Sequence, residues 1–418
     1  MQAMNDSAQP ESTYAWLRLW TSLALMTLGG VAMYGVVVVL PAVQVEFGVT
    51  RADASLPYTL TLIGFGIGGI LMGALADRFG VIVPVLIGAV GLGAGMILAG
   101  LSASLLQFAL ASGVLAGMLG CSATFAPLVA DSSLWFTRRR GIAVAIVISG
   151  NYLAGTVWPP VLQHFFDQSG WRATYIGVGI FCLAVMLPLA LVLRRRPPAI
   201  VATVSASAAA KIERPLGLSP NALTVLLSIA GLGCCVAMSM PQVHIVAYCG
   251  DLGYGVQRGA EMLSLMLGFG IVSRLAFGWI SDRIGGLRTL LLGSALQGIA
   301  LALFLPFDGL ASLYVVSALF GLFQGGLVPA YPIIVREFFP PREAGTRVSI
   351  VLMATLFGMA LGGWISGALF DLTGSYRAAF INGIGWNLLN MSIAFWLLRR
   401  SYGNHAPAGV NSPAALRL

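Results

Sequence analysis

The stretch GFGIVSRLAFGWISDRIGG, residues 268–286, carries the two features that decide the fold of this chain. Its last part, GWISDRIG (278–285), repeats GALADRFG (73–80), which lies 205 residues earlier. Its first part is apolar except for Ser273 and Arg274. A permanent cation inside an apolar run needs a physical reason, and the rest of the sequence narrows the choices.

The composition excludes a soluble protein. Of the 418 residues, 58% are hydrophobic and 9% are charged, and the mean hydropathy is +0.89. A soluble domain carries about 25% charged residues. One transmembrane helix needs about 20 mostly apolar residues, and many stretches here meet that length. A β-barrel would show short alternating strands instead of these long apolar runs. We therefore expect an all-α membrane protein.

The apolar runs predict twelve transmembrane helices in two pseudo-symmetric six-helix halves. The twelve predicted spans lie at about 17–40, 56–76, 82–101, 104–134, 141–165, 171–193, 221–249, 259–280, 287–306, 310–336, 346–369 and 376–398. The chain then divides into a tail (1–16), a first half (17–193), a Pro- and Ser-rich linker (194–220), a second half (221–398) and a second tail (399–418).

The distribution of cations predicts the orientation. Of the 23 Lys and Arg residues, 18 fall on one side of the predicted spans, four fall on the other, and Arg274 is the remaining one. Cytoplasmic loops carry the excess of Lys and Arg, so both termini and the linker should be cytoplasmic. The polar start lacks the pattern of a signal peptide. Short loops and tails indicate a bacterial inner membrane.

The two halves repeat each other beyond the opening motif. Further matched pairs are EFGV (46–49) with DLGY (251–254), Pro127 with Pro332, and FDQSGWRATY (166–175) with FDLTGSYRAAF (370–380). Parallel six-helix halves of this kind bind their substrate between them, near the middle of the membrane.

These motifs resemble the major facilitator superfamily over nearly the whole chain. The resemblance rests on a repeated signature, formed by Gly73, Asp77, Arg78 and Gly80 and by Gly278, Asp282, Arg283 and Gly285. It implies the major facilitator fold and a transporter, not an enzyme. It also implies that the signature is conformational, with Asp77 contacting the start of the eleventh span when the cytoplasmic side closes.

Within the superfamily, the chain resembles the monocarboxylate and oxalate/formate porter branch. The resemblance rests on SLWFTRRRGIAVAI (133–146), PQVHIVAYCGDLGYG (241–255) and VSRLAFGWISDRIG (272–285). It implies that Arg274 is the substrate-facing arginine of the eighth span.

The chain departs from this branch at three charged positions. Animal members carry an aspartate four residues before the arginine, where this chain has Gly270. The lysine of their first span is absent from YGVVVVLP (34–41). The second cation of the oxalate/formate exchanger is absent from LMATLFGMALGG (352–363). Proton symport and anion exchange therefore both stay open.

Arg274 itself predicts an anion site. It lies eight residues before Asp282, or about 12 Å into the membrane at 1.5 Å per residue. A lone arginine at that depth costs at least about 2.5 kcal/mol. No Asp or Glu is predicted at the same depth, so the missing partner is a bound carboxylate, which a guanidinium grips at two points. The alternative is that Arg274 binds main-chain carbonyls and only holds helices together.

Other polar residues at comparable depth are candidates to complete the substrate site. They are Tyr34, Thr124, Asn151, Tyr152, Ser239, Gln324 and Thr355. For each, an ordinary hydrogen bond between helices is the alternative. His244, in the outer third of the seventh span, is the candidate for proton coupling or gating, because histidine changes charge near neutral pH. Its alternative is an ordinary interfacial histidine.

We therefore expect secondary transport of a small organic monocarboxylate by alternating access, coupled to protons. Anion exchange, efflux of amphipathic compounds and a transport-inactive nutrient receptor are the alternatives. The five cysteines and three histidines lack metal-binding spacing, and no phosphate-binding loop occurs, so we expect no cofactor and no metal. We expect a lipid-embedded functional monomer that binds no nucleic acid.

Overall fold

The structure is a computed structural model that describes residues 11–136, 140–195, 215–339 and 341–404. Secondary structure in these ranges is entirely helical. Most of the predicted linker and much of both predicted tails lie outside the described residues.

The first half contains α2 to α8, with one π-helical stretch, η1. Its elements are α2 (Thr13–Gly29), α3 (Val31–Phe47), α4 (Arg51–Phe79), α5 (Ile82–Gly100), α6 (Leu105–Leu110), η1 (Ala111–Cys121), α7 (Ala126–Trp135) and α8 (Arg140–Leu191). The second half contains α9 (Pro220–Asp251), α10 (Val256–Ile284), α11 (Gly286–Leu303), α12 (Leu310–Gln324), α13 (Leu327–Phe338), α14 (Pro341–Thr373) and α15 (Tyr376–Asn404). Short 3₁₀ turns lie at Val192–Arg194 and Pro215–Gly217.

The helices are long enough to cross a membrane many times. Within the described residues, ten helical segments have the length and apolar composition of a span. One of them, Ile142–Arg194, reverses at Gly170, where φ is 77°, and so contains two crossings. The 29-residue α15 packs against α9 and α11. This arrangement is consistent with the predicted twelve spans and confirms the fold class.

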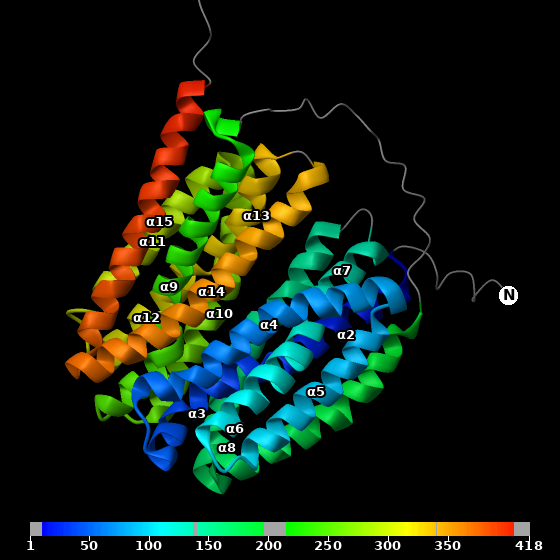
Figure 1. Cartoon of the computed structure of the whole chain (residues 1–418), viewed down its shortest axis with the longest axis vertical. Helices are drawn as coiled ribbons and strands as arrows, with labels where there is room; N and C mark the ends of the chain where they lie inside the picture. The colour runs from blue at the N-terminus through cyan, green and yellow to red at the C-terminus, as the bar shows by residue number, and fades with distance from the viewer. Residues whose placement is uncertain (1–10, 137–139, 196–214, 340, 405–418) are drawn as a thin grey trace, which may run out of the picture.

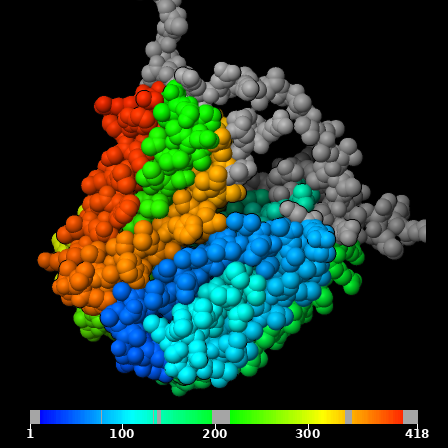
Figure 2. Space-filling view, in the orientation of Figure 1, coloured from blue at the N-terminus to red at the C-terminus, as the bar shows by residue number. Residues whose placement is uncertain are grey.

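The two halves lie side by side, and three pairs of helices make most of the contacts between them. Helix α4 packs against α14, α8 packs against α10, and α3 contacts α9. We call the end with the linker and the signature motifs the linker end, and the opposite end, with Arg51 and Asp251, the distal end. The halves diverge toward the linker end (Figure 1), and the orange surface of the second half lies along the blue surface of the first half (Figure 2).

The repeated signature ends a helix in the same way in both halves. Gly80 follows α4 with φ 88° and ψ 161°, and Gly285 follows α10 with φ 82° and ψ 163°. Essentially only glycine adopts this backbone conformation. The last glycine of each motif is therefore required by the turn itself.

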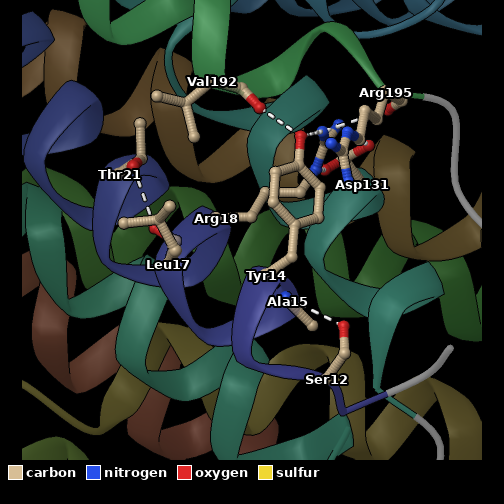
Figure 3. Close-up of polar contacts among 9 residues, drawn as sticks. All are labelled: Ser12, Tyr14, Ala15, Leu17, Arg18, Thr21, Asp131, Val192 and Arg195. Atoms are coloured by element: carbon tan, nitrogen blue, oxygen red, sulfur yellow. Dashed lines mark hydrogen bonds and ion pairs between the residues drawn. The ribbon is translucent and has the colours of Figure 1, made fainter. Parts of the chain in front are cut away.

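A buried ion pair holds the linker end of the first half together (Figure 3). Arg18 of α2 donates two hydrogen bonds to the carboxylate of Asp131 in α7, at 2.7 and 2.8 Å. The two side chains are 2% and 5% exposed. Arg18 also donates to the carbonyl oxygen of Arg195 at 3.1 Å, and its guanidinium lies 4.9 Å from the ring centroid of Trp135. From the sequence, Arg18 was one of the 18 cations that predict the orientation, and its pairing with Asp131 was not predicted.

Candidate functional site

Arg274 lies at the interface between the two halves. Its guanidinium carbon is 3.7 Å from the ring centroid of Tyr152, which belongs to α8 in the other half. A guanidinium over an aromatic face gains about 1–2 kcal/mol when partly desolvated. Arg274 is half-buried and Tyr152 is buried. The arginine is thus held from the side by a neutral ring.

Gly270 makes room for this stacking. A Cβ atom at Gly270 would lie 2.5 Å from Cε1 of Tyr152, so any larger residue there would displace the ring. The sequence analysis noted that animal monocarboxylate transporters carry an aspartate at the position of Gly270. In this chain, the Tyr152 ring lies against the bare backbone there, so an aromatic face stands beside the cation where those relatives carry an acid.

The charge of Arg274 is not neutralised within the described part of the chain. No described carboxylate lies within ion-pair distance of its guanidinium. Its buried Nε atom has no hydrogen-bond partner among the described residues. An arginine in this state retains donors that can bind an anionic ligand.

Tyr34 and Asn151 complete a small polar cluster beside Arg274. The hydroxyl of Tyr34 in α3 donates to Oδ1 of Asn151 in α8 at 3.1 Å. Tyr34 also packs on Gly155, where a Cβ would lie 2.6 Å from the tyrosine Cζ. Asn151 directly precedes Tyr152, the ring over which the Arg274 guanidinium lies. The structure therefore brings together four of the predicted site residues from three helices and both halves.

Three other predicted site residues use their hydroxyl groups elsewhere. Ser239 donates to the carbonyl oxygen of Met359 in α14 at 2.7 Å. Thr124 and Thr355 donate to carbonyl oxygens three residues earlier in the chain, at 3.0 and 2.7 Å. All three side chains are buried. Ser239 thus makes a hydrogen bond between helices, whereas Thr124 and Thr355 bond within their own segments; a role of the three residues in substrate binding stays a prediction.

Gln324 is fully buried at the end of α12. Neither of its amide atoms has a hydrogen-bond partner among the described residues. The next residue, Gly325, packs so closely on α10 that a Cβ there would lie 2.5 Å from the carbonyl oxygen of Gly270. Gln324 thus adjoins the helix contact that positions the turn carrying Arg274.

His244 lies apart from this cluster, near the distal end. Its Nε2 atom is 2.8 Å from the carbonyl oxygen of Gly363, and its Nδ1 atom is 3.4 Å from the hydroxyl of Tyr376. The ring is fully buried. It therefore lies between α9, α14 and α15, out of contact with the medium in this state.

The predicted contact of Asp77 with the start of the eleventh span is not described. The side chain of Asp77 and those of residues 341–346 lie outside the described residues. Of the other signature residues, Arg78 is exposed beside Phe79, and the guanidinium of Arg283 lies 3.4 Å from the ring centroid of Trp279. The locking role of the signature stays a prediction.

Sequence reasoning missed a second set of contacts between the halves, at the distal end. Nη2 of Arg51 lies 3.1 Å from the carboxylate of Asp251. The main-chain N–H groups of Arg51 and Ala52 donate to the carboxylate of Asp371 at 2.8 and 2.7 Å. The matched motifs around Asp251 and Asp371 marked these carboxylates as repeated positions, but nothing in the sequence assigned their partners.

The described residues contain no group of three His, Cys, Asp or Glu side chains that could hold a metal ion. The chemistry of the site is that of a guanidinium, two phenols and one amide. These groups bind an anion or a hydrogen-bonding solute; they contain no activated nucleophile.

A family model described as Major Facilitator Superfamily matches residues 21–312 and, in a second match, residues 261–415. The chain belongs to the Major Facilitator Superfamily. It is therefore a multi-pass membrane transporter and not an enzyme. The resemblance drawn from the repeated signature is confirmed.

Curated relatives of this superfamily member include proteins named as monocarboxylate transporters. Monocarboxylate transporter 13 of Bos taurus is 28% identical over 385 residues, covering 89% of this chain and 86% of the relative. The MFS-type transporter pynF of Aspergillus niger is 24% identical over 395 residues, covering 94% and 90%.

Solved structures of transporters share the fold. A bacterial homolog to the human lysosomal transporter Spinster superimposes with a TM-score of 0.72 at 16% identity, over 94% of this chain and 98% of that chain. The nucleoside transporter NupG superimposes with a TM-score of 0.70 at 15% identity, over 92% and 98%.

Proposed function

We propose that this chain transports a small organic monocarboxylate across the membrane by alternating access, and that Arg274 binds the carboxylate. The observation that carries the proposal is the state of Arg274, which lies between the halves, half-buried and without a described acidic partner. The relatives named as monocarboxylate transporters support the same substrate class.

The cluster suits a carboxylate better than a neutral solute. The planar guanidinium donates two parallel hydrogen bonds to the two carboxylate oxygens. Tyr152 covers one face of the guanidinium, so the ligand binds at its edge. The hydroxyl of Tyr34 and the amide of Asn151 then meet the rest of a small molecule. A single cation with two phenols matches one carboxylate and a short organic remainder.

Ligand binding also favours movement of the halves. Enclosing an unpaired guanidinium in a low-dielectric interface is unfavourable, and a bound anion removes most of that penalty. Because Arg274 and Tyr152 belong to different halves, the loaded site joins the halves across the interface. The substrate therefore lowers the barrier to the rocking motion.

The proposal includes an orientation and a motive force. The linker end faces the cytoplasm of a bacterial inner membrane, because it carries most of the Lys and Arg residues. The halves diverge at this end (Figure 1), so we assign the structure to the state that is open toward the cytoplasm. A monomer works as a proton symporter, and anion exchange is the alternative that the experiment below distinguishes.

Uptake into proteoliposomes tests the carboxylate site. Wild type, Arg274→Lys and Arg274→Ala are compared on a panel of small monocarboxylates and their uncharged amides. We expect Arg274→Ala to lose at least tenfold in uptake, and Arg274→Lys to recover only part of it, because an ammonium lacks the planar fork. Arg258→Ala, which removes an exposed cation at the start of α10, is the matched control and should leave uptake unchanged.

Two results would overturn the carboxylate assignment: equal uptake by all three Arg274 forms, or transport of the amides as fast as the acids. A second arm separates the motive forces. Symport gives uptake driven by an inward proton gradient into empty vesicles, whereas exchange requires a carboxylate preloaded inside.

A further inference from the structure

The distal end is closed by groups from three helices, α4 of the first half and α9 and α14 of the second. Arg51 of α4 pairs with Asp251 of α9, and its guanidinium lies 4.9 Å from the ring centroid of Phe370 in α14. The carboxylate of Asp371 accepts the first two N–H groups of α4, where a helix attracts negative charge. One turn earlier, a Cβ on Gly367 would lie 2.9 Å from the carbonyl oxygen of Arg51. The halves therefore touch here without intervening space.

His244 lies directly behind this closure, and each of its ring nitrogens faces a hydrogen-bonding group. The carbonyl oxygen of Gly363 can only accept a hydrogen bond, so Nε2 of His244 carries a hydrogen. The Nδ1 atom lies 3.4 Å from the hydroxyl of Tyr376, which donates to it when the ring is neutral. A neutral imidazole with its hydrogen on Nε2 therefore uses both nitrogens.

The charged groups near His244 come from three helices. They are Arg51 from α4, Asp371 from α14, and Asp251 on the same helix as His244, and they also surround Tyr376. Helix α15 supplies the Tyr376 phenol, which contacts the ring. Both described hydrogen-bond partners of the ring are uncharged: a carbonyl and a phenol.

A second proton on His244 would disturb the closed distal end in two ways. The Nδ1–H group would need an acceptor, so the hydrogen of the Tyr376 hydroxyl would have to rotate away and leave the oxygen to accept. A new positive charge would also be enclosed beside Arg51, without a carboxylate in contact with the ring. Burying such a charge is strongly unfavourable unless it is paired.

We propose that His244 is a proton-binding site that controls the distal closure of the empty transporter. The proton binds when the halves separate at the distal end and water reaches the ring, and closure of the empty transporter expels it. Acid therefore shifts the empty transporter toward the distal-open state, and the empty transporter carries no proton on this residue as it closes. The inference rests on the alternating access of the proposed function but not on the identity of the substrate.

Pulsed electron resonance between two spin labels tests this in the full chain, reconstituted without substrate. The labels replace Val45 in α3 and Leu372 in α14, which are strongly exposed near the distal end of each half, while the five native cysteines are buried. In wild type, we expect the ratio of distal-open to distal-closed molecules to rise about tenfold from pH 7.5 to pH 5.5. One proton can change such a ratio by at most about tenfold per pH unit.

The decisive variant is His244→Gln, whose amide still donates to the Gly363 carbonyl but does not titrate. We expect its ratio to be the same at both pH values. His164→Gln is the matched control, because His164 is an exposed histidine of α8 that contacts Gln168, and it should respond like wild type. A wild-type ratio that ignores pH, or a His244→Gln protein that responds like wild type, would overturn the proposal.

A second measurement leaves His244 in place. In a His164→Gln/His405→Gln protein, His244 is the only histidine, and the ¹⁵N chemical shifts of its ring report charge and tautomer. At pH 7.5 we expect a neutral ring with hydrogen on Nε2; a charged ring or an Nδ1–H tautomer would contradict the assignment. Neither readout depends on uptake, so failure of the carboxylate site at Arg274 would leave both results unchanged.

Discussion

The distal ends of the two halves carry matching charges that make different contacts. Glu46 and Asp251 occupy equivalent positions in the repeat, as do Arg172 and Arg377. In the first half, Glu46 pairs with Arg172 of the same half at 2.7 Å. In the second half, Asp251 pairs instead with Arg51 of the first half, while Arg377 is exposed.

A second pair of carboxylates shows the same difference. Asp167 accepts a hydrogen bond at 2.8 Å from Gln163, one turn earlier in α8. Its repeat counterpart, Asp371, binds the start of α4 in the other half. For Asp251 the difference follows from a residue that is not repeated, because the counterpart of Arg51 is Val256. Asp371 instead binds main-chain N–H groups, so its contact depends on how α4 and α14 pack together.

The comparison teaches that repeated carboxylates can serve two purposes. Contacts inside one half are kept when the halves move, so they stabilise the folded half. Contacts between halves exist in only one state of the transport cycle, so they set the balance between states. Three substitutions test this division, in order of decreasing expected effect.

Asp131→Ala should have the largest effect, on stability alone. It leaves Arg18 as a buried, unpaired cation inside the first half, which costs about 3–5 kcal/mol. Thermal unfolding in detergent, followed by intrinsic fluorescence, measures the loss. The double variant Arg18→Met/Asp131→Leu should recover most of it, because an apolar pair leaves no unpaired charge. A stable Asp131→Ala protein with an altered distal-open ratio would contradict the division.

Arg51→Ala should change the balance of states with a smaller effect on unfolding. It removes the ion pair with Asp251 between the halves, so the distal-open fraction should rise, by about 10- to 100-fold in the open-to-closed ratio. The Val45/Leu372 label pair measures this ratio. Exchanging the charges, with Arg51→Asp and Asp251→Arg together, should restore part of the closed population. An unchanged ratio in Arg51→Ala would show that the pair does not hold the distal end.

Glu46→Gln should have the smallest effect. Its pair with Arg172 lies inside the first half. The side chain of Glu46 is 39% exposed and that of Arg172 is 34% exposed. Exposed pairs contribute about 1 kcal/mol or less. We expect a small drop in melting temperature and no change in the distal-open ratio. A shift in that ratio comparable to that of Arg51→Ala would remove the distinction between the two halves.

The sequence predicted most residues of the candidate site but few of the contacts that they make. Hydropathy alone marked Arg274, and depth along the predicted spans selected Tyr34, Asn151 and Tyr152, which the structure brings to one cluster. The same depth argument also selected Thr124, whose hydroxyl is used within its own helix segment. Depth along a helix does not give direction around it, so this criterion could not separate the two cases.

Charge pairing was the part that sequence reasoning missed most. Arg18 and Arg51 were both counted as cations that orient the protein, yet one is buried against Asp131 and the other joins the halves. At Gly270, the sequence showed only that the acid of the animal relatives is absent. The ring that packs against this glycine is that of Tyr152 in α8, more than a hundred residues away.

The amino-acid sequence by itself determined the membrane class, the repeated halves, the glycine turns after α4 and α10, and the presence of a cation deep in the eighth span. Each of these depends on composition or on local backbone geometry, which neighbouring residues dictate. Only the tertiary structure decided that Tyr152 stacks on Arg274, that Arg51 meets Asp251 and Asp371, and that His244 lies behind them. Those partners depend on which helices pack together and at what rotation, because an ion pair or a stacked ring forms only where two distant segments meet within a few ångströms.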